Sequence, residues 1–248
     1  MEILGVRVDE YTMQETEELV AAQLAAPVPP CLHQVVTINP IGVMLAVERP
    51  ALKEIVAQAA AVTADGSGIL WAAQRLGRPL REQVAGYHLL CRLCERGASA
   101  GWRVYLLGSR PGIADAAARE LQSRYPGLQI CGTENGYFRD REAAVIEAVR
   151  AAQPDLLFAA LGMPYQEEWL YQHRAELGCK VAVGVGGSLD VLAGAVKHAP
   201  DWVCRIHLEW LWRLLGDPKR LRADLAIPRF MRAVRREARR RRSGREQA

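Results

Sequence analysis

The feature that most constrains the fold is a series of short apolar runs, each ending in a turn and most followed by helical periodicity. These runs are predicted strands, and they cover residues 34–38, 62–63, 102–107, 129–131, 155–161 and 180–185. Strand, turn and helix in alternation are typical of a parallel sheet with helices on both faces. We therefore expect an α/β fold, for which the hydrophobic half of the residues supplies a sizeable core.

The composition changes after Pro200. From Lys219 to the end there are 12 Lys or Arg and 3 Asp or Glu residues, so this segment carries +9 while the rest of the chain carries −5. Phe230, Met231 and Val234 fall on one face of a predicted helix, and arginines cover most of the remainder, a pattern typical of helices that lie on anionic membranes. A helix packed on the body, or a disordered tail, is the alternative. We expect a core over residues 1–200 and a helical, membrane-associating appendage over 201–248.

Several functional classes are disfavoured by what the chain lacks. The six cysteines are scattered apart from Cys91 and Cys94, which have no second pair to complete a zinc site and are typical of reduced cytosolic thiols. The first residues do not read as a signal peptide, and no apolar stretch is long enough to span a bilayer. Apart from the tail there is no basic, aromatic-interleaved surface and no nucleic-acid-binding module, so no nucleic-acid partner is expected.

Polar residues follow the predicted strands where the turns begin. Because ligands of parallel sheets bind beyond the carboxyl ends of the strands, we expect these residues to meet in one site. The clusters are Thr37 with Asn39, Asp65 with Gly66, Gly108 with Ser109, residues 162–166 and residues 186–190.

Asp65 is the candidate base, because a carboxylate at this edge could take a proton from an attacking hydroxyl. Its usual pKa of about 3.9 is low for that role, so burial would have to raise it; an Asp that caps the next helix is the alternative. Thr37 and Asn39 alternate along a strand and point to one side, where they could hold a sugar hydroxyl or a phosphate. The alternative is that Asn39 and Pro40 only begin a turn.

Two glycine-rich loops, at residues 108–112 and 184–188, could cradle a phosphate with backbone N–H groups, although loops of this composition are also ordinary turns. Neither carries the full dinucleotide fingerprint, which disfavours a nicotinamide oxidoreductase. The chain has no D-x-D triplet and no cluster with metal-ligand spacing, so no metal site is expected. A diphosphate would then be stabilised by backbone N–H groups and arginines.

Together the motifs resemble the WecG/TagA/CpsF glycosyltransferases, from about residue 5 to about residue 220. Each motif alone is weak, but their order and spacing are specific. They are residues 37–40 (TINP), 64–68 (ADGSG), 84–86 (VAG), 105–108 (YLLG), 125–127 (YPG), 132–138 (GTENGYF), 160–167 (ALGMPYQE), 185–194 (VGGSLDVLAG), 199–200 (AP) and 208–214 (LEWLWRL).

The resemblance implies a Rossmann-like, metal-independent, inverting glycosyltransferase that needs no cofactor. Family members pass N-acetylmannosamine or a related sugar from UDP to undecaprenyl-diphosphate-linked N-acetylglucosamine, for teichoic acid, common antigen or capsule synthesis. Asp65 matches the proposed base, and Thr37, Asn39 and Gln166 match polar residues of the catalytic pocket. Substrate-binding residues are then expected at Gly66, Gly108, Ser109, Gly136, Tyr137, Gly162, Gly186, Gly187, Ser188, Asp190, His198, Arg220 and Arg222.

The resemblance also implies that the C-terminal segment closes over the site and docks on the inner face of the bacterial membrane. The protein would then be cytoplasmic and peripheral to that membrane; its oligomeric state, including a homo-oligomer, stays open. The chain departs from the family pattern at Gln83, His88, His198 and Ala223, where Arg, Asp, Arg and Arg are usual. A catalytically impaired paralogue that binds UDP-sugar or scaffolds a synthesis complex is therefore the alternative function, although the retained Asp65 and Gln166 favour an enzyme.

Overall fold

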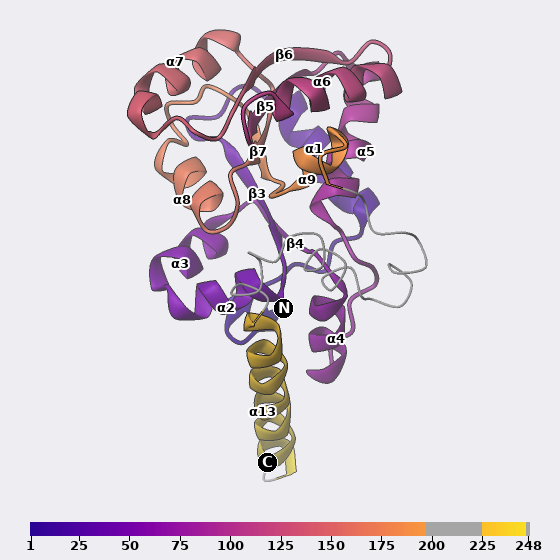
Figure 1. Cartoon of the computed structure of the whole chain (residues 1–248). Helices are drawn as coiled ribbons and strands as arrows, with labels where there is room; N and C mark the ends of the chain where they lie inside the picture. Colours follow the sequence, from indigo (N-terminus) through magenta and orange to yellow (C-terminus); the bar gives the residue numbers. More distant parts are fainter. Residues whose placement is uncertain (197–224, 247–248) are drawn as a thin grey trace.

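A computed structural model describes residues 1–196 and 225–246. Its centre is a six-stranded, fully parallel sheet, which confirms the predicted α/β fold (Figure 1). Each predicted strand is present, with the order β4-β3-β8-β7-β5-β6 across the sheet. The strands are β3 (His33–Ile38), β4 (Ala61–Ala64), β5 (Arg103–Gly108), β6 (Gln129–Glu134), β7 (Leu156–Ala160) and β8 (Val181–Gly184).

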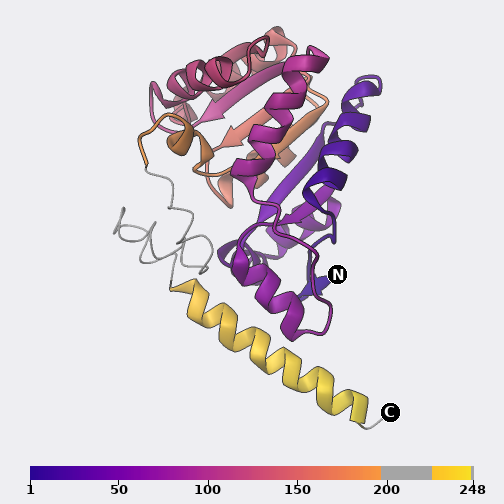
Figure 2. The same ribbon diagram turned by 90° about the vertical axis from the view of Figure 1, so that its right-hand side faces the viewer.

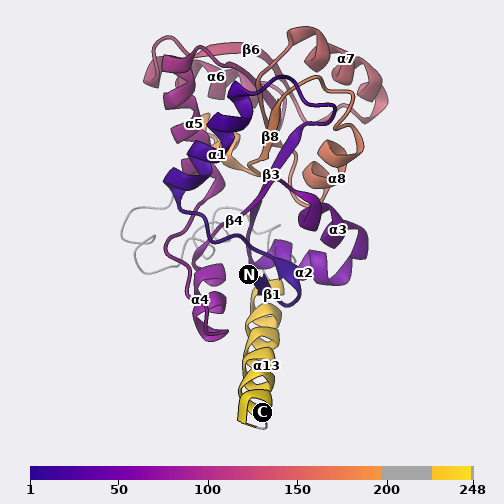
Figure 3. The ribbon, with the colours of Figure 1, turned by 180° about the vertical axis from the view of Figure 1, so that it is seen from behind.

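Helices cover both faces of this sheet, as Figures 1 and 3 show from opposite sides. One face carries α1 (Met13–Ala25), α5 (Gly86–Ala100), α6 (Ile113–Arg124) and α9 (Ser188–Leu192). The other carries α2 (Pro40–Glu48), α3 (Pro50–Gln58), α7 (Glu142–Ala152) and α8 (Tyr165–Gln172), while α4 (Ser67–Arg75) lies with α2 near the β4 edge. A short antiparallel hairpin, β1 (Glu2–Ile3) with β2 (Val6–Arg7), and a 3₁₀ helix, η1 (Arg139–Arg141), complete these elements.

Two-residue periodicity in the strands separates the core into two layers. Val104 and Leu106 face the α1, α5 and α6 side, whereas Tyr105 and Leu107 face the α7 and α8 side. Successive side chains of a strand point to opposite faces, so a strand buried on both must be apolar throughout. This requirement explains why the sequence showed continuous apolar runs rather than alternation.

Helix boundaries follow local chemistry. In α1, the Thr12 side chain accepts from the Glu15 backbone N–H and the Glu15 carboxylate accepts from the Thr12 N–H, forming a capping box. The helical periodicity that follows β3, from Pro40 to about residue 60, belongs to two helices, α2 and α3, which are separated at Arg49. Pro50 causes the break, because proline has no N–H and disfavours helical backbone in the residue before it.

The last described helix is α13 (Ala226–Glu246), which runs away from the sheet with its first half against α2 and α4 (Figure 2). Phe230 and Val234 are fully buried in the core cluster that those helices share. The prediction that this apolar stripe faces a membrane is therefore wrong: the stripe packs on the body, as the alternative had it. Residues 201–224 of the predicted appendage, with Arg220 and Arg222, lie outside the described residues, and so does His198 of the predicted core. Within the described part, no helix is both long and apolar enough to cross a bilayer.

Candidate active site

The sheet has a topological switch point between β5 and β7. After β5 the chain passes through α6 on one face to the edge strand β6, and after β7 it passes through α8 on the other face to β8. The two connections leave in opposite directions and open a space beyond the carboxyl ends of the strands. Such a point is where parallel α/β sheets bind ligands.

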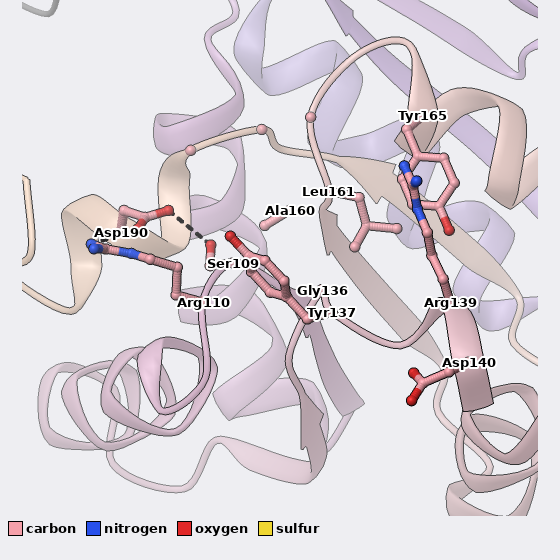
Figure 4. A pocket seen from close by; sticks show the side chains of 13 residues that line it. Ser109, Arg110, Gly136, Tyr137, Arg139, Asp140, Ala160, Leu161, Tyr165 and Asp190 are labelled. Atoms are coloured by element: carbon pink, nitrogen blue, oxygen red, sulfur yellow. Dashed lines mark hydrogen bonds and ion pairs between the residues drawn. The ribbon is translucent and has the colours of Figure 1, made fainter. Parts of the chain in front are cut away.

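A hollow of about 860 Å³ occupies this position. Figure 4 shows Ser109, Arg110 and Asp190 gathered on one side of it and Arg139 beside Tyr165 on the other, with Tyr137 between them. Its volume is within the range of small-molecule sites. The hollow is lined by Ser109, Arg110, Gly136, Tyr137, Arg139, Asp140, Ala160, Leu161, Gly162, Tyr165, Gly186, Gly187 and Asp190.

One wall is built from the loop after β5 and the start of α9. The Ser109 hydroxyl donates to Asp190 Oδ2 at 2.8 Å, and Arg110 Nη2 lies 3.8 Å from Asp190 Oδ1. Ser109 has a left-handed backbone with φ of 59°. Residue 108, before it, has to be glycine, because a Cβ there would lie 2.4 Å from the Ala160 carbonyl oxygen. The loops after β5 and β7 thus touch directly, and Asp190 is held at the rim by a hydroxyl and a guanidinium.

The opposite wall is the loop after β6. Glu134 anchors it, because its carboxylate accepts from both the Asn135 backbone N–H and the Arg141 guanidinium. The Arg141 hydrogen bond holds the pKa of Glu134 below its usual range. This loop presents Tyr137 with 67% of its surface exposed. An exposed aromatic ring on a tethered loop can stack on a planar ligand.

Arg139 extends this wall and lies over the Tyr165 ring, 5.5 Å from its centroid. With Arg110, it places a guanidinium on each side of the hollow. Guanidinium groups suit phosphate oxygens because their N–H groups form a planar fork. Burial raises the pKa of Tyr165, so its phenol stays protonated and can donate.

Glycines form the floor between β7 and β8. A Cβ at Gly162, Gly186 or Gly187 would meet nothing within 4 Å, so these residues leave space open. Gly162 and Gly186 also have positive φ values of 81° and 52°, which favour glycine. Gln166 lies beneath them: it is only 2% exposed, and its Oε1 accepts from the Gly162 and Gly186 N–H groups. Gln166 therefore shapes the floor and does not line the hollow.

Thr37 and Asn39 bind the protein's own backbone. The Thr37 hydroxyl donates to the Gly184 carbonyl at 2.8 Å, and Asn39 Oδ1 accepts from the Gly42 N–H at 2.9 Å as the cap of α2. For Asn39, the observed contact is that of a helix cap, so Asn39 and Pro40 begin a helix and not only a turn. Neither lines the hollow.

Asp65 and Gly66 lie where β4 passes into α4. Asp65 is half-buried, and its backbone N–H donates to the Ile38 carbonyl, which ties the ends of β3 and β4. Gly66, with φ of 92°, precedes the first turn of α4. β4 lies two strands from β8, so Asp65 is set about 10 Å sideways from the end of β8, where Gly186 and Gly187 follow.

The predicted phosphate cradle is only partly available. The Ser109 N–H donates to the Ala160 carbonyl, and the Gly186 N–H is taken by Gln166. The Ser188 hydroxyl donates to the Val185 carbonyl and is buried, so it serves the turn. The charged wall residues therefore matter more for an anionic ligand than the backbone does. Among the described residues no cluster of three or more His, Cys, Asp or Glu could hold a metal ion.

Residues 1–244 match the Glycosyl transferase WecG/TagA/CpsF family. The chain is also similar to a protein of Bacillus spizizenii (strain ATCC 23059 / NRRL B-14472 / W23), with 35% identity over 81% of this chain and 77% of the relative. A Staphylococcus aureus (strain MRSA252) protein shares 35% identity over 93% of this chain and 90% of the relative. Both are named N-acetylglucosaminyldiphosphoundecaprenol N-acetyl-beta-D-mannosaminyltransferase.

The chain belongs to the WecG/TagA/CpsF glycosyltransferase family. In this glycosyltransferase the structure brings together Ser109, Gly136, Tyr137, Gly162, Gly186, Gly187 and Asp190 around one hollow, and leaves Asp65, Gly66, Thr37, Asn39, Gln166 and Ser188 outside its lining. Gly108 lies directly behind Ser109.

The sequence interpretation did not single out six of the lining residues, although Tyr165 lies in the 162–166 cluster and Arg110 in the 108–112 loop that it did name: Arg110, Arg139, Asp140, Ala160, Leu161 and Tyr165. Ala160 and Leu161 lie at the end of the predicted strand 155–161, Arg110 follows the end of β5, and Arg139 and Asp140 follow the motif at 132–138. Position after a strand was therefore the signal that could have found them.

Proposed function

We propose that this glycosyltransferase moves an N-acetylmannosaminyl group, or a related sugar, from UDP to undecaprenyl-diphosphate-linked N-acetylglucosamine. The names of the two relatives supply both the sugar and the acceptor. The observation that carries the proposal is the hollow at the switch point, with an exposed aromatic ring and two guanidinium groups at its walls. These are the groups that a nucleotide diphosphate requires: a stacking surface for the base and cations for the phosphates.

The donor is proposed to bind in this hollow. Arg110 and Arg139 would neutralise the diphosphate without a metal, and Tyr137 would contact the base. Asp190, already bound by Ser109, offers carboxylate oxygens to ligand hydroxyl groups. The sugar would then project over the floor glycines toward β3 and β4, where Asp65 lies.

Transfer is proposed to proceed with inversion. The acceptor hydroxyl attacks the anomeric carbon from the face opposite UDP, Asp65 takes the hydroxyl proton, and the bond to the UDP oxygen breaks. One carboxylate is sufficient, because no covalent intermediate has to be formed and hydrolysed. UDP leaves as an anion, so stabilising its charge matters more than protonating it.

The test is a mass-spectrometric screen of UDP-sugars with a soluble lipid-diphosphate-GlcNAc analogue, with and without excess EDTA. The expected product is a disaccharide-diphosphate, formed equally well with chelator, and NMR of its new anomeric centre should show a linkage inverted relative to the donor. Loss of activity with EDTA and recovery with Mg²⁺ or Mn²⁺ would contradict the metal-independent part. UDP binding without transfer from any donor would support the impaired-paralogue alternative, for which Gln83 is the main sequence signal.

Association with the inner face of the membrane is proposed to use the arginines of α13 rather than its apolar stripe. Arg236, Arg239, Arg240 and Arg242 are exposed in the second half of α13, and Figure 2 shows this helix running away from the sheet. Each basic residue near an anionic surface contributes about 1 kcal/mol, and salt screens this attraction. The acceptor lipid lies in the same plane, so docking would raise its effective concentration.

The variant Arg239→Gln, Arg240→Gln, Arg242→Gln tests this role. It is expected to lower binding to phosphatidylglycerol vesicles by about tenfold or more in low salt. The matched control removes the same charge elsewhere, with Arg92→Gln, Arg96→Gln and Arg119→Gln on α5 and α6. Equal binding by the two triple variants would contradict a role for α13.

A further inference from the structure

One buried acid has no part in the mechanism so far. Among the residues that the structure describes, Glu167 is the one acidic side chain in the buried class, and it is fully inaccessible. Its Oε1 accepts from Gln166 Nε2 at 2.7 Å, and its Oε2 has no hydrogen-bond partner. A buried carboxyl with one oxygen unpaired is costly, so its retention needs a reason.

The partner of Glu167 is the side chain that holds the floor of the hollow. Gln166 Oε1 accepts from the Gly162 N–H at 3.2 Å and from the Gly186 N–H at 3.1 Å. An amide can do this only when its oxygen, and not its NH₂ group, faces the two donors. The NH₂ group then points to Glu167, where the carboxyl oxygen is the acceptor that completes it.

The pair is closely packed against the end of β8. A Cβ at Gly184 would lie 2.6 Å from Gln166 Nε2 and 2.9 Å from Glu167 Oε1. The Gly184 carbonyl in turn accepts from the Thr37 hydroxyl, and the Glu167 carbonyl accepts from Gln34 Nε2. The pair is therefore clamped between α8, β3 and β8, directly under two loops that line the hollow.

The protonation state suits this arrangement. Burial raises the pKa of Glu167 to about 8; the Gln166 hydrogen bond lowers it, and the negative charge of the adjacent Glu168 also raises it. The neutral acid therefore predominates below about pH 8. A proton on Oε2 leaves Oε1 as a carbonyl acceptor for Gln166, so the neutral pair needs no counter-charge.

We propose that Glu167 is a positioning residue for the transfer reaction: it orients the Gln166 amide, and the amide holds the Gly162 and Gly186 N–H groups below the floor so that the hollow stays open. Its role in transfer rests on the proposed function, whereas its hold on the floor does not. Thr37 belongs to the same network on the β3 side, because its hydroxyl donates to the carbonyl of Gly184, the residue against which Gln166 and Glu167 pack.

Two substitutions of Glu167 separate its role in orienting the Gln166 amide from the space that its side chain fills. Glu167→Gln keeps the shape and an oxygen that can accept from Gln166; Glu167→Met keeps the length and removes the acceptor. In the ligand-free full chain, amide hydrogen exchange is measured for peptides that contain Gly162 and Gly186. Exchange in Glu167→Met is expected to be faster by about tenfold, because a buried amide loses its partner, while Glu167→Gln stays near the wild type.

Function gives the second readout. The affinity for UDP, measured by calorimetry, is expected to fall by about tenfold in Glu167→Met and by less than about threefold in Glu167→Gln.

Unchanged exchange in folded Glu167→Met would overturn the positioning role. If that variant does not fold, exchange in Glu167→Gln that is about tenfold faster than in the wild type would overturn it, because Glu167→Gln keeps an oxygen that accepts from Gln166. A wild type that binds no UDP would instead refute the proposed donor, and the exchange measurement would still decide the role of Glu167.

Discussion

The carboxyl edge of the sheet has two regions that are alike in sequence and different in structure. At the end of β3, the Thr37 side chain binds the Gly184 carbonyl at the end of β8, and the Asn39 side chain binds the Gly42 N–H in the first turn of α2. At the ends of β5, β7 and β8, glycines supply no side chain, and a hollow of about 860 Å³ remains. Both regions appeared in the sequence as polar or glycine-containing turns after strands.

The difference shows that polar side chains beside a turn often hydrogen-bond backbone groups of the protein, which leaves them unavailable to a ligand. Turns leave N–H and C=O groups without ladder partners, and short polar side chains nearby are the cheapest way to satisfy them. A ligand site can form where the N–H and C=O groups of a turn are hydrogen-bonded by other backbone groups or by a buried side chain. Gln166 is such a side chain, because its Oε1 accepts from the Gly162 and Gly186 N–H groups. Asp65, half-buried at the end of β4, is the proposed chemical link between the two regions.

The largest effect is expected from Asp65→Asn, which tests whether the β3–β4 region takes part in chemistry at all. The amide keeps the shape of the side chain and cannot accept a proton from the acceptor hydroxyl. Transfer should slow by roughly 100-fold or more, with UDP affinity little changed. Single-turnover rates and UDP calorimetry measure the two quantities. Near-wild-type turnover would leave the region with a structural role only.

A smaller effect is expected from filling the hollow at Gly187. This residue has an ordinary φ of −80°, and a Cβ there meets nothing within 4 Å, so a side chain adds bulk without backbone strain. Gly187→Leu should weaken UDP binding by about tenfold, while Gly187→Ala, the matched control, should change it little. Melting temperatures should stay close to the wild type. Full UDP affinity in Gly187→Leu would place the nucleotide elsewhere.

Much of the fold could be predicted because its signals are local. Continuous apolar runs such as 155–161 and 180–185 mark strands buried on both faces, and the turns after them mark the binding edge. The break at Pro50 was also available from the sequence, but helical periodicity on both sides concealed it. The hairpin of β1 and β2 was missed, because strands of two residues carry no period.

The site was harder to predict because it depends on which strands become neighbours. Arg139 follows β6 and Tyr165 follows β7, and only the order of strands across the sheet brings them to one hollow. For Phe230 and Val234 the sequence pattern was recognised, but its partner was predicted wrongly: a membrane was expected, and the body of the protein is observed. An amphipathic stripe indicates that a helix lies on something apolar, and α2 and α4 meet that need as well as a membrane does.

Asn39 gives the finest test of the comparison, because the family resemblance makes it a pocket residue and the structure makes it a helix cap. Asn39→Ala removes the oxygen that accepts from the Gly42 N–H, so the free energy of unfolding should fall by about 1 kcal/mol. Asn39→Ser restores a capping oxygen while removing the amide, so it should recover most of that stability. If capping is the whole role, transfer by Asn39→Ser should stay within about threefold of the wild type, because the end of β3 is then intact. Urea denaturation and initial transfer rates measure the two effects on the same samples. A stable Asn39→Ser that has lost transfer would show that the amide contacts substrate, and the two regions of the edge would then form one continuous site.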